Sequence, residues 1–173
     1  KLPKEINLGD LIYGLPSSGP HSNGFTLIRK LLELEAKDKV SELKKSLMTA
    51  TRLYSDFAQD PVILNSCSGF AHITGGGIVD NLPRIFSKDL TAKIQLDSWD
   101  VPISLKWAIK KARLSQNQAL QTFNCGIGFI AVVPINKSRE FEIQSKKINE
   151  PVVKIGEIIQ GNQLEFKGNL NID

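Results

Sequence analysis

A strand, a loop and a helix follow one another in residues 10–36, which read DLIYGLPSSGPHSNGFTLIRKLLELEA. The apolar run at 10–15 predicts a short buried strand. Two prolines and a glycine at 16–20 cannot continue a strand ladder, so they predict a loop. Apolar residues recur at helical spacing over 25–36, and Ser22-Asn23 before them are good helix N-cap residues. The segment therefore predicts a strand that leads into a helix through a loop rich in Gly, Ser and Pro.

The same order recurs later in the chain. Residues 69–74 predict a second strand, Gly75-Gly76-Gly77 a loop, and residues 78–85 a short helical segment that is interrupted near Pro83. Further strands are predicted at 93–96, 126–133, 152–159 and 164–166, and further helices at 40–59, in two pieces, and at 105–112. Strands that alternate with helices predict one α/β domain over residues 1–173, with a sheet between two layers of helices.

Composition and charge exclude several classes of protein. The chain has 173 residues, of which 23% are charged, and it contains no polar low-complexity tract, which excludes a disordered chain. No apolar run reaches the roughly 18 residues of a membrane helix and no signal peptide is recognised, so we expect a soluble, cytoplasmic protein with no membrane partner. The net charge of +4 comes from dispersed basic residues, which argues against a nucleic-acid partner.

Metal and thiol chemistry finds little support in the sequence. The only two histidines, His21 and His72, are far apart in the chain, and the only two cysteines, Cys67 and Cys125, do not form a CxxC motif. No local zinc site is therefore predicted. We expect both thiols to be reduced, and Cys125 to be a buried, inert thiol rather than a nucleophile. The nucleotide and nucleophile motifs Walker A, GxGxxG and GxSxG do not occur.

Two loops carry the candidate chemistry, and each follows a predicted strand. In the loop before Phe25, glycine lets the backbone approach a ligand, and the following helix N-terminus favours an anion such as phosphate. His21 could pair with that anion or transfer a proton; the alternative is a capped turn with an exposed histidine. The three glycines at 75–77 favour close approach of a ligand to the other loop. We expect the two loops to converge at one end of the sheet.

Charged residues near the second glycine-rich loop leave two interpretations open. Asp80 and Arg84 could form a salt bridge at a helix end, or Arg84 could be a further phosphate contact. The candidates for binding substrate or phosphate are thus small or polar loop residues and one arginine, namely Ser17, Ser18, Gly19, Ser22, Thr74, Gly75, Gly76, Gly77 and Arg84.

Four strings of residues, taken in order, resemble the C-terminal domain of phosphoribosylformylglycinamidine cyclo-ligase, also called aminoimidazole ribonucleotide (AIR) synthetase. They are SSGPHSNGF at 17–25, HITGGG at 72–77, NLPR at 81–84 and TFNCGIG at 122–128. The likeness runs from about Gly9 to Gly161, and it implies a three-layer α/β/α domain with a mixed sheet. Two residues depart from the family pattern: Ala50 stands where proline is usual, and Asp80 where glutamate is common.

The resemblance implies an ATP-dependent ring closure in purine biosynthesis. The amide oxygen of formylglycinamidine ribonucleotide is phosphorylated, an internal nitrogen attacks, phosphate leaves, and aminoimidazole ribonucleotide forms together with ADP. In this family an N-terminal domain, absent from this chain, carries the ATP site, the acidic ligands of Mg²⁺ and most of a homodimer interface. We therefore expect ATP and Mg²⁺ to be bound mainly outside this chain, which alone should not turn over ATP.

By matching motif, the resemblance implies that His21 and Asn23 line the active site as catalytic residues. It also implies that Thr74, with Gly75 to Gly77, holds the substrate through its ribose phosphate. Because both catalytic candidates lie in a loop, we expect them to be exposed, so that changing either to Ala lowers turnover with little effect on the melting temperature. Two other functions stay open. One is that of another ATP-using superfamily member, such as selenophosphate synthetase or thiamine-monophosphate kinase, and the other is that of a non-catalytic anion-binding or interaction domain.

Overall fold

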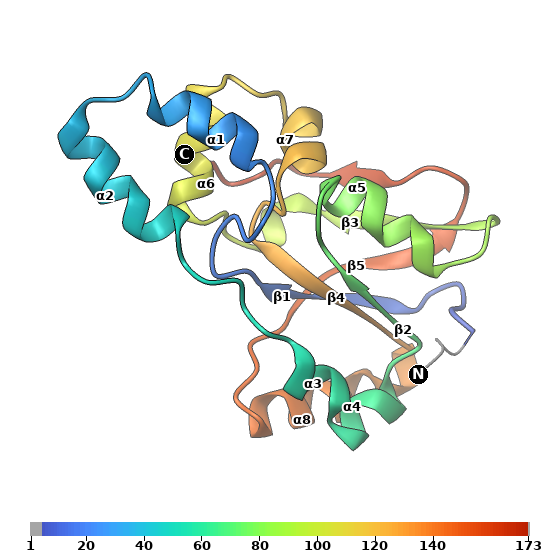
Figure 1. Cartoon of the computed structure of the whole chain (residues 1–173). Helices are drawn as coiled ribbons and strands as arrows, with labels where there is room; N and C mark the ends of the chain where they lie inside the picture. The colour runs from blue at the N-terminus through green and yellow to red at the C-terminus, as the bar shows by residue number, and fades with distance from the viewer. Residues whose placement is uncertain (1–4, 173) are drawn as a thin grey trace.

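A six-stranded sheet forms the centre of the computed structural model, which describes residues 5–172 (Figure 1). The strands are β1 Leu11–Pro16, β2 Gly69–His72, β3 Leu90–Gln95, β4 Ile127–Val133, β5 Val153–Gln160 and β6 Glu165–Lys167. They lie in the order β2-β4-β1-β5-β3-β6. Among these strands all neighbours are antiparallel except β3 and β6, which are parallel, so the sheet is mixed, as the resemblance implies.

Helices cover both faces of the sheet. They are α1 Phe25–Leu32, α2 Lys37–Leu47, α3 Ser55–Gln59, α4 Pro61–Ser66, α5 Gly77–Asn81, α6 Ile103–Lys111, α7 Gln116–Thr122 and α8 Ser138–Lys147. Figure 1 shows α1, α2, α5, α6 and α7 on one side of the sheet and α3, α4 and α8 on the other. The three-layer α/β architecture expected from the sequence is therefore confirmed.

Two hydrophobic cores lie on opposite faces of the central strands. In β1, Ile12 belongs to the larger core, whereas its neighbours Leu11 and Tyr13 belong to the smaller one, because successive side chains of a strand point to opposite faces. All seven residues of β4 are buried. The continuous apolar sequence of β4 is thus the consequence of helices packing on both of its sides, as the sequence predicted.

The pairing of β4 brings three loops to one edge of the sheet. β1 and β2 both run antiparallel to β4, so both strands end where β4 begins. The segments at this edge are the first loop (residues 17–24, after β1), the second loop (residues 73–76, after β2) and the third loop (residues 123–126, before β4). The convergence expected from the sequence is confirmed, and the third loop joins the other two because β4 lies between β1 and β2.

The helix after the first loop differs from the expectation at both ends. It ends at Leu32 rather than at residue 36, and Ala36 is instead the N-cap of α2. Its N-cap is Gly24, at a φ of 69° and without a side-chain cap, so the prediction that Ser22 or Asn23 caps this helix is wrong. The physical reason is that Gly24, at its positive φ, turns the chain into the helix one residue later, while the Asn23 amide nitrogen donates to another loop.

The remaining elements include one that was predicted from the sequence and one that was not. The segment at 78–85 is α5 followed by a 3₁₀ turn, Leu82–Ile85, so its expected interruption is confirmed. Helix α8 was not predicted, because only Phe141 and Ser145 of its ten residues are buried and no apolar repeat marks it. Cys67 and Cys125 are both buried and are not bonded to each other, and the burial expected of Cys125 is confirmed. Within residues 5–172, no helix combines the length and the apolar character needed to cross a bilayer.

Candidate functional site

The first and second loops are joined by a side chain that the sequence had marked as catalytic. The Asn23 amide nitrogen donates a hydrogen bond to the Thr74 carbonyl oxygen at 2.9 Å, although the two residues are 51 positions apart. Asn23 is 2% exposed, so this bond is made away from water. The expectation that Asn23 is an exposed loop residue is therefore wrong, because its amide is used to hold the two loops together.

Two more buried amides hold these loops, and the sequence did not mark either as functional: Asn81 acts within the second loop, and Asn124 joins the third loop to the first. Asn81 donates to the carbonyl oxygens of Thr74, Gly75 and Gly77, at 3.3, 3.1 and 2.8 Å, and it accepts from the Thr74 hydroxyl at 3.1 Å. A side-chain amide has two N–H donors, so one of them is shared between two of the three carbonyls, and a single Asn can thus hold a glycine-rich turn that lacks side chains.

The Asn124 side chain likewise forms hydrogen bonds with the first loop. Its nitrogen donates to the Gly19 carbonyl at 2.9 Å, and its oxygen accepts from the Ser17 hydroxyl at 3.1 Å and from the Gly126 N–H at 2.9 Å. The available signal was an Asn near the glycines, because Asn81 follows Gly77 by four residues and Asn124 precedes Gly126 by two. An Asn side chain can form hydrogen bonds with backbone groups that have no partner in a helix or a strand.

The three consecutive glycines have different roles. Gly77 has a φ of 59°, and a Cβ there would lie 1.9 Å from the Leu120 carbonyl oxygen, so packing against α7 requires glycine. Gly76 has a φ of 90°, and a Cβ would meet the Asp80 carboxylate. Gly75 needs no positive φ, and a Cβ on it would meet nothing within 4 Å. Close approach of a ligand therefore stays a prediction for Gly75, whereas the fold itself explains Gly76 and Gly77.

His21 lies beneath the surface of the first loop. It is 7% exposed, which contradicts the expectation of an exposed histidine, and its φ of 55° turns the ring back over its own loop. The Ser18 N–H donates to the His21 Nε2 at 3.1 Å, and the Arg52 N–H does so at 3.5 Å. Burial lowers the pKa of His21 below its ordinary value, and the nearby His72 and Arg52 lower it further.

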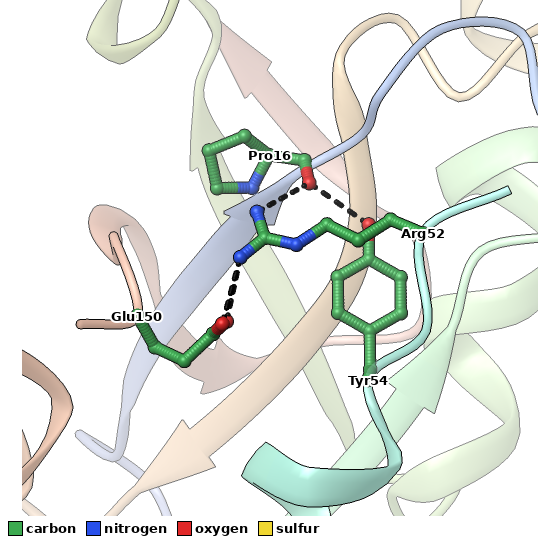
Figure 2. Close-up of polar contacts among 4 residues, drawn as sticks. All are labelled: Pro16, Arg52, Tyr54 and Glu150. Atoms are coloured by element: carbon green, nitrogen blue, oxygen red, sulfur yellow. Dashed lines mark hydrogen bonds and ion pairs between the residues drawn. The ribbon is translucent and has the colours of Figure 1, made fainter. Parts of the chain in front are cut away.

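The segment between α2 and α3 holds the end of β1 in place. Figure 2 shows Arg52 and Tyr54 reaching the Pro16 carbonyl oxygen, which accepts from the Arg52 guanidinium at 3.2 Å and from the Tyr54 hydroxyl at 2.8 Å. The same guanidinium forms an ion pair with Glu150 at 2.8 Å, and it lies 5.5 Å from the centre of the Tyr54 ring. The first loop thus leaves β1 from a fixed point, and sequence reasoning assigned no role to these residues.

The remaining candidates form the outer surface of this edge. Ser18, Ser22, Thr74 and Gly75 are exposed, while Ser17 is partly buried and Gly19 is buried. Arg84 is exposed in the 3₁₀ turn, and the ion pairs found within residues 5–172 do not join it to Asp80. Of the two interpretations of Arg84, the helix-end salt bridge is therefore not formed in this structure.

Metal and thiol chemistry is not provided by these loops. Within residues 5–172, no three His, Cys, Asp or Glu side chains gather closely enough to hold a metal ion. Cys125 lies in the third loop, and burial raises the pKa of its thiol to about 12, which leaves it protonated at neutral pH. The residues present can offer hydrogen-bond donors, acceptors and an imidazole, which suits the binding of a polar or anionic ligand.

The sequence profile of the family described as AIR synthase related protein, C-terminal domain, matches residues 7–169, which include all three loops. The chain belongs to this family. Two relatives are named phosphoribosylformylglycinamidine cyclo-ligase. The protein from Vigna unguiculata, named as chloroplastic/mitochondrial, is 39% identical over 170 residues, which is 94% of this chain and 44% of the relative. The protein from Citrifermentans bemidjiense is 39% identical over 161 residues, which is 88% of this chain and 46% of the relative.

Solved structures share the fold of this AIR synthase related domain at much lower identity. The hydrogenase maturation protein HypE from E. coli has a TM-score of 0.61 and 16% identity, and the match covers 97% of this chain and 50% of HypE. Thiamine-monophosphate kinase from Stenotrophomonas maltophilia has a TM-score of 0.59 and 15% identity, and the match covers 96% of this chain and 52% of the kinase. The domain therefore spans about half the length of the proteins that it matches.

Proposed function

We propose that this chain is the C-terminal, substrate-side part of a phosphoribosylformylglycinamidine cyclo-ligase. The observation that carries the proposal is 39% identity to two proteins with this name over nearly the whole chain. The proposed reaction is the ATP-dependent closure of formylglycinamidine ribonucleotide to aminoimidazole ribonucleotide in purine biosynthesis. The likeness to HypE and thiamine-monophosphate kinase concerns the fold alone and favours neither of their activities.

In this proposal the substrate lies on the surface formed by the first and second loops. Ser18, Ser22, Thr74 and Gly75 supply exposed hydroxyls and open backbone, which suit the oxygen atoms of a ribose phosphate. Asn23, beneath this surface, holds the loops at a fixed separation. Asn23 is therefore a positioning residue, which supports catalysis by holding the loops. His21 is the candidate for contact with the reacting part of the substrate.

ATP, Mg²⁺ and further contacts are assigned to parts outside this chain. The described residues do not form a metal-binding cluster, so no step that involves Mg²⁺ is assigned to them. The chain spans less than half the length of the cyclo-ligases to which it is similar, which leaves room for an N-terminal part that binds ATP and forms a homodimer. A cytoplasmic location and the lack of nucleic-acid partners stay predictions.

An ADP-release assay tests the proposal in the complete protein, with formylglycinamidine ribonucleotide as the substrate. We expect Mg²⁺-dependent release of ADP together with formation of aminoimidazole ribonucleotide, and no release by the 173-residue chain alone. Parallel reactions with thiamine monophosphate and with selenide test the rival superfamily activities. ADP release with either of these, and none with formylglycinamidine ribonucleotide, would contradict the proposal. Binding of the ribonucleotide without any turnover would favour the non-catalytic domain.

A further inference from the structure

The segment between α2 and α3, residues 48–54, contacts the first loop along its length. The Ser18 hydroxyl donates to the Ala50 carbonyl oxygen at 2.7 Å, and the Arg52 N–H donates to the His21 Nε2 at 3.5 Å. These partners are 32 and 31 positions apart in the chain. Ser18 is exposed, so the contacts include the outer surface on which the substrate is proposed to lie. The place of that surface therefore depends on a segment outside the three loops.

The Arg52 guanidinium connects this segment to the start of the first loop and to the chain that follows α8. One of its nitrogens donates to the Pro16 carbonyl oxygen at 3.2 Å, and the other donates to the two carboxylate oxygens of Glu150 at 2.9 and 2.8 Å (Figure 2). The planar guanidinium has donors in fixed directions, so it can hold both partners at once, which a single ammonium group does poorly. Arg52 thus fixes the point from which the first loop leaves β1.

The ion pair between Arg52 and Glu150 is partly shielded from water. Their side chains are 25% and 23% exposed. For comparison, the Lys93 and Glu157 side chains, which pair across β3 and β5, are 43% and 45% exposed. Partly buried pairs are screened less than exposed ones, so the first pair restrains its side chains more strongly. The guanidinium is therefore kept where it meets the Pro16 carbonyl.

We propose that Arg52, with Glu150, is a positioning residue that sets the affinity of the first loop for the ribonucleotide without touching it. This inference rests on the proposed function for the identity of the substrate. Ordering a loop on binding costs conformational entropy, and a loop that is already held in place avoids this cost. Exposed Ser18 and Ser22 are then presented to the substrate in one arrangement. Binding of ATP, assigned to parts outside this chain, does not depend on Arg52.

The Arg52→Met variant of the complete protein tests this role, because it removes the guanidinium and keeps the backbone N–H that faces His21. We expect the KM for formylglycinamidine ribonucleotide to rise about tenfold and the KM for ATP to change less than twofold. Arg52→Lys should lie between the wild type and Arg52→Met, because its ammonium group cannot serve Pro16 and Glu150 together. An equal rise in both KM values, or a lower kcat with neither KM changed, would overturn the proposal.

A double-mutant cycle tests whether Arg52 acts through its ion pair. Glu150→Gln removes the charge of the partner, and we expect the ribonucleotide KM to rise about threefold. The double variant Arg52→Met/Glu150→Gln should have the same KM as Arg52→Met alone, because both changes affect one interaction. If Arg52 touched the substrate itself, Glu150→Gln alone would leave this KM unchanged, and that result would overturn the proposal.

Lys93→Met serves as the matched control, because it breaks an ion pair of the same kind away from the three loops. We expect it to leave both KM values unchanged. A rise in the ribonucleotide KM as large as that of Arg52→Met would show that the site responds to the loss of any ion pair, and it would overturn the specific role of Arg52.

Hydrogen–deuterium exchange of the complete protein without ligand tests the position of the loop independently of activity. The Ser17 N–H donates to the Gly126 carbonyl at 2.8 Å, and the Ser18 N–H donates to His21. In Arg52→Met we expect peptides that cover residues 16–24 to exchange several-fold faster, and peptides that cover residues 73–76 to be unchanged. Unchanged exchange at residues 16–24 would overturn the proposal.

A failure of the proposed function is distinguishable from a failure of this inference. If the complete protein does not convert formylglycinamidine ribonucleotide but Arg52→Met speeds exchange in the first loop alone, the proposed function fails and the positioning of the loop by Arg52 stands. If the protein does convert it and Arg52→Met leaves its KM unchanged, the proposed function stands and the positioning role is refuted.

Discussion

The first and second loops meet at the same edge of the sheet but are stabilised in different ways. In the first loop, side chains make the structure: Ser17 bonds to Asn124, and His21 accepts from two backbone groups. The second loop depends instead on its glycines and on one helical side chain, because Gly77, which follows the loop, packs against α7, and the Asn81 amide of α5 donates to the loop carbonyls. A substitution in the first loop therefore changes stability and function together, whereas Gly75 in the second can report on function alone.

The largest expected effect tests the claim that the second loop depends on its glycines. Gly77→Ala should lower the free energy of unfolding by about 3 kcal/mol or more, because the new methyl group meets the Leu120 carbonyl and the φ of 59° disfavours a side chain. Denaturant unfolding of the 173-residue chain measures the change. A loss below about 1 kcal/mol would show that the packing against α7 is looser than the structure indicates.

A smaller effect tests the claim that side chains hold the first loop. Asn124→Ala removes one donor and one acceptor and leaves the Gly19 carbonyl and the Gly126 N–H unpaired, so we expect a loss of roughly 2–3 kcal/mol. Asn23→Ala removes one bond, and we expect a loss of about 1 kcal/mol. Thermal unfolding of both variants checks this order. An unchanged melting temperature for Asn23→Ala would restore the original expectation of an exposed, purely functional residue.

The pH dependence of stability tests the burial of His21. A lowered pKa means that the unfolded chain takes up a proton before the folded chain does, so stability should be complete above about pH 6.5 and should fall as the pH drops below it. The melting temperature at pH 7.5 and at pH 5.5 measures the effect. We expect His21→Gln to reduce the difference and His72→Gln, at an exposed position, to keep most of it. An unchanged difference in His21→Gln would show that His21 is not the sensitive group.

The smallest effect on stability is expected at Gly75. Gly75→Ala should change the free energy of unfolding by less than about 0.5 kcal/mol, because a Cβ meets nothing within 4 Å. If substrate approaches this backbone, KM should rise about fivefold in the complete protein, the effect of about 1 kcal/mol of lost binding. Asn117→Ala, at an exposed position on α7, serves as the control. An unchanged KM would remove Gly75 from the site.

The sequence predicted the strands and the meeting of the loops, because both depend on local patterns. A strand followed by a glycine-rich loop is visible at 10–24 and again at 69–77, and the apolar run of β4 marks a strand covered on two faces. The sequence could not show what the buried amides do. Asn23 and Asn124 bond to residues 51 and 105 positions away, and no local pattern records the partner of such a side chain.

The burial of His21 was missed for a related reason. Its loop is rich in Gly, Ser and Pro, which is typical of exposed turns, and the residues that cover it, Arg52 and Tyr54, come from a segment between two helices. Helices α7 and α8 were missed because few of their residues face a core. Helix formation there follows from packing and from the capping box of Ser115 and Gln118 rather than from an apolar repeat.

The position of β4 has a consequence for the order in which this molecule can fold. The first and second loops lie before residue 77, yet they are neighbours only because β4, at residues 127–133, pairs with both β1 and β2. As the chain leaves the ribosome, its first 126 residues contain both loops without the strand that aligns them. Contacts of such long sequence separation form slowly. The edge of the sheet that carries the candidate site is therefore completed only when β4 has been made, after most of the residues of that edge.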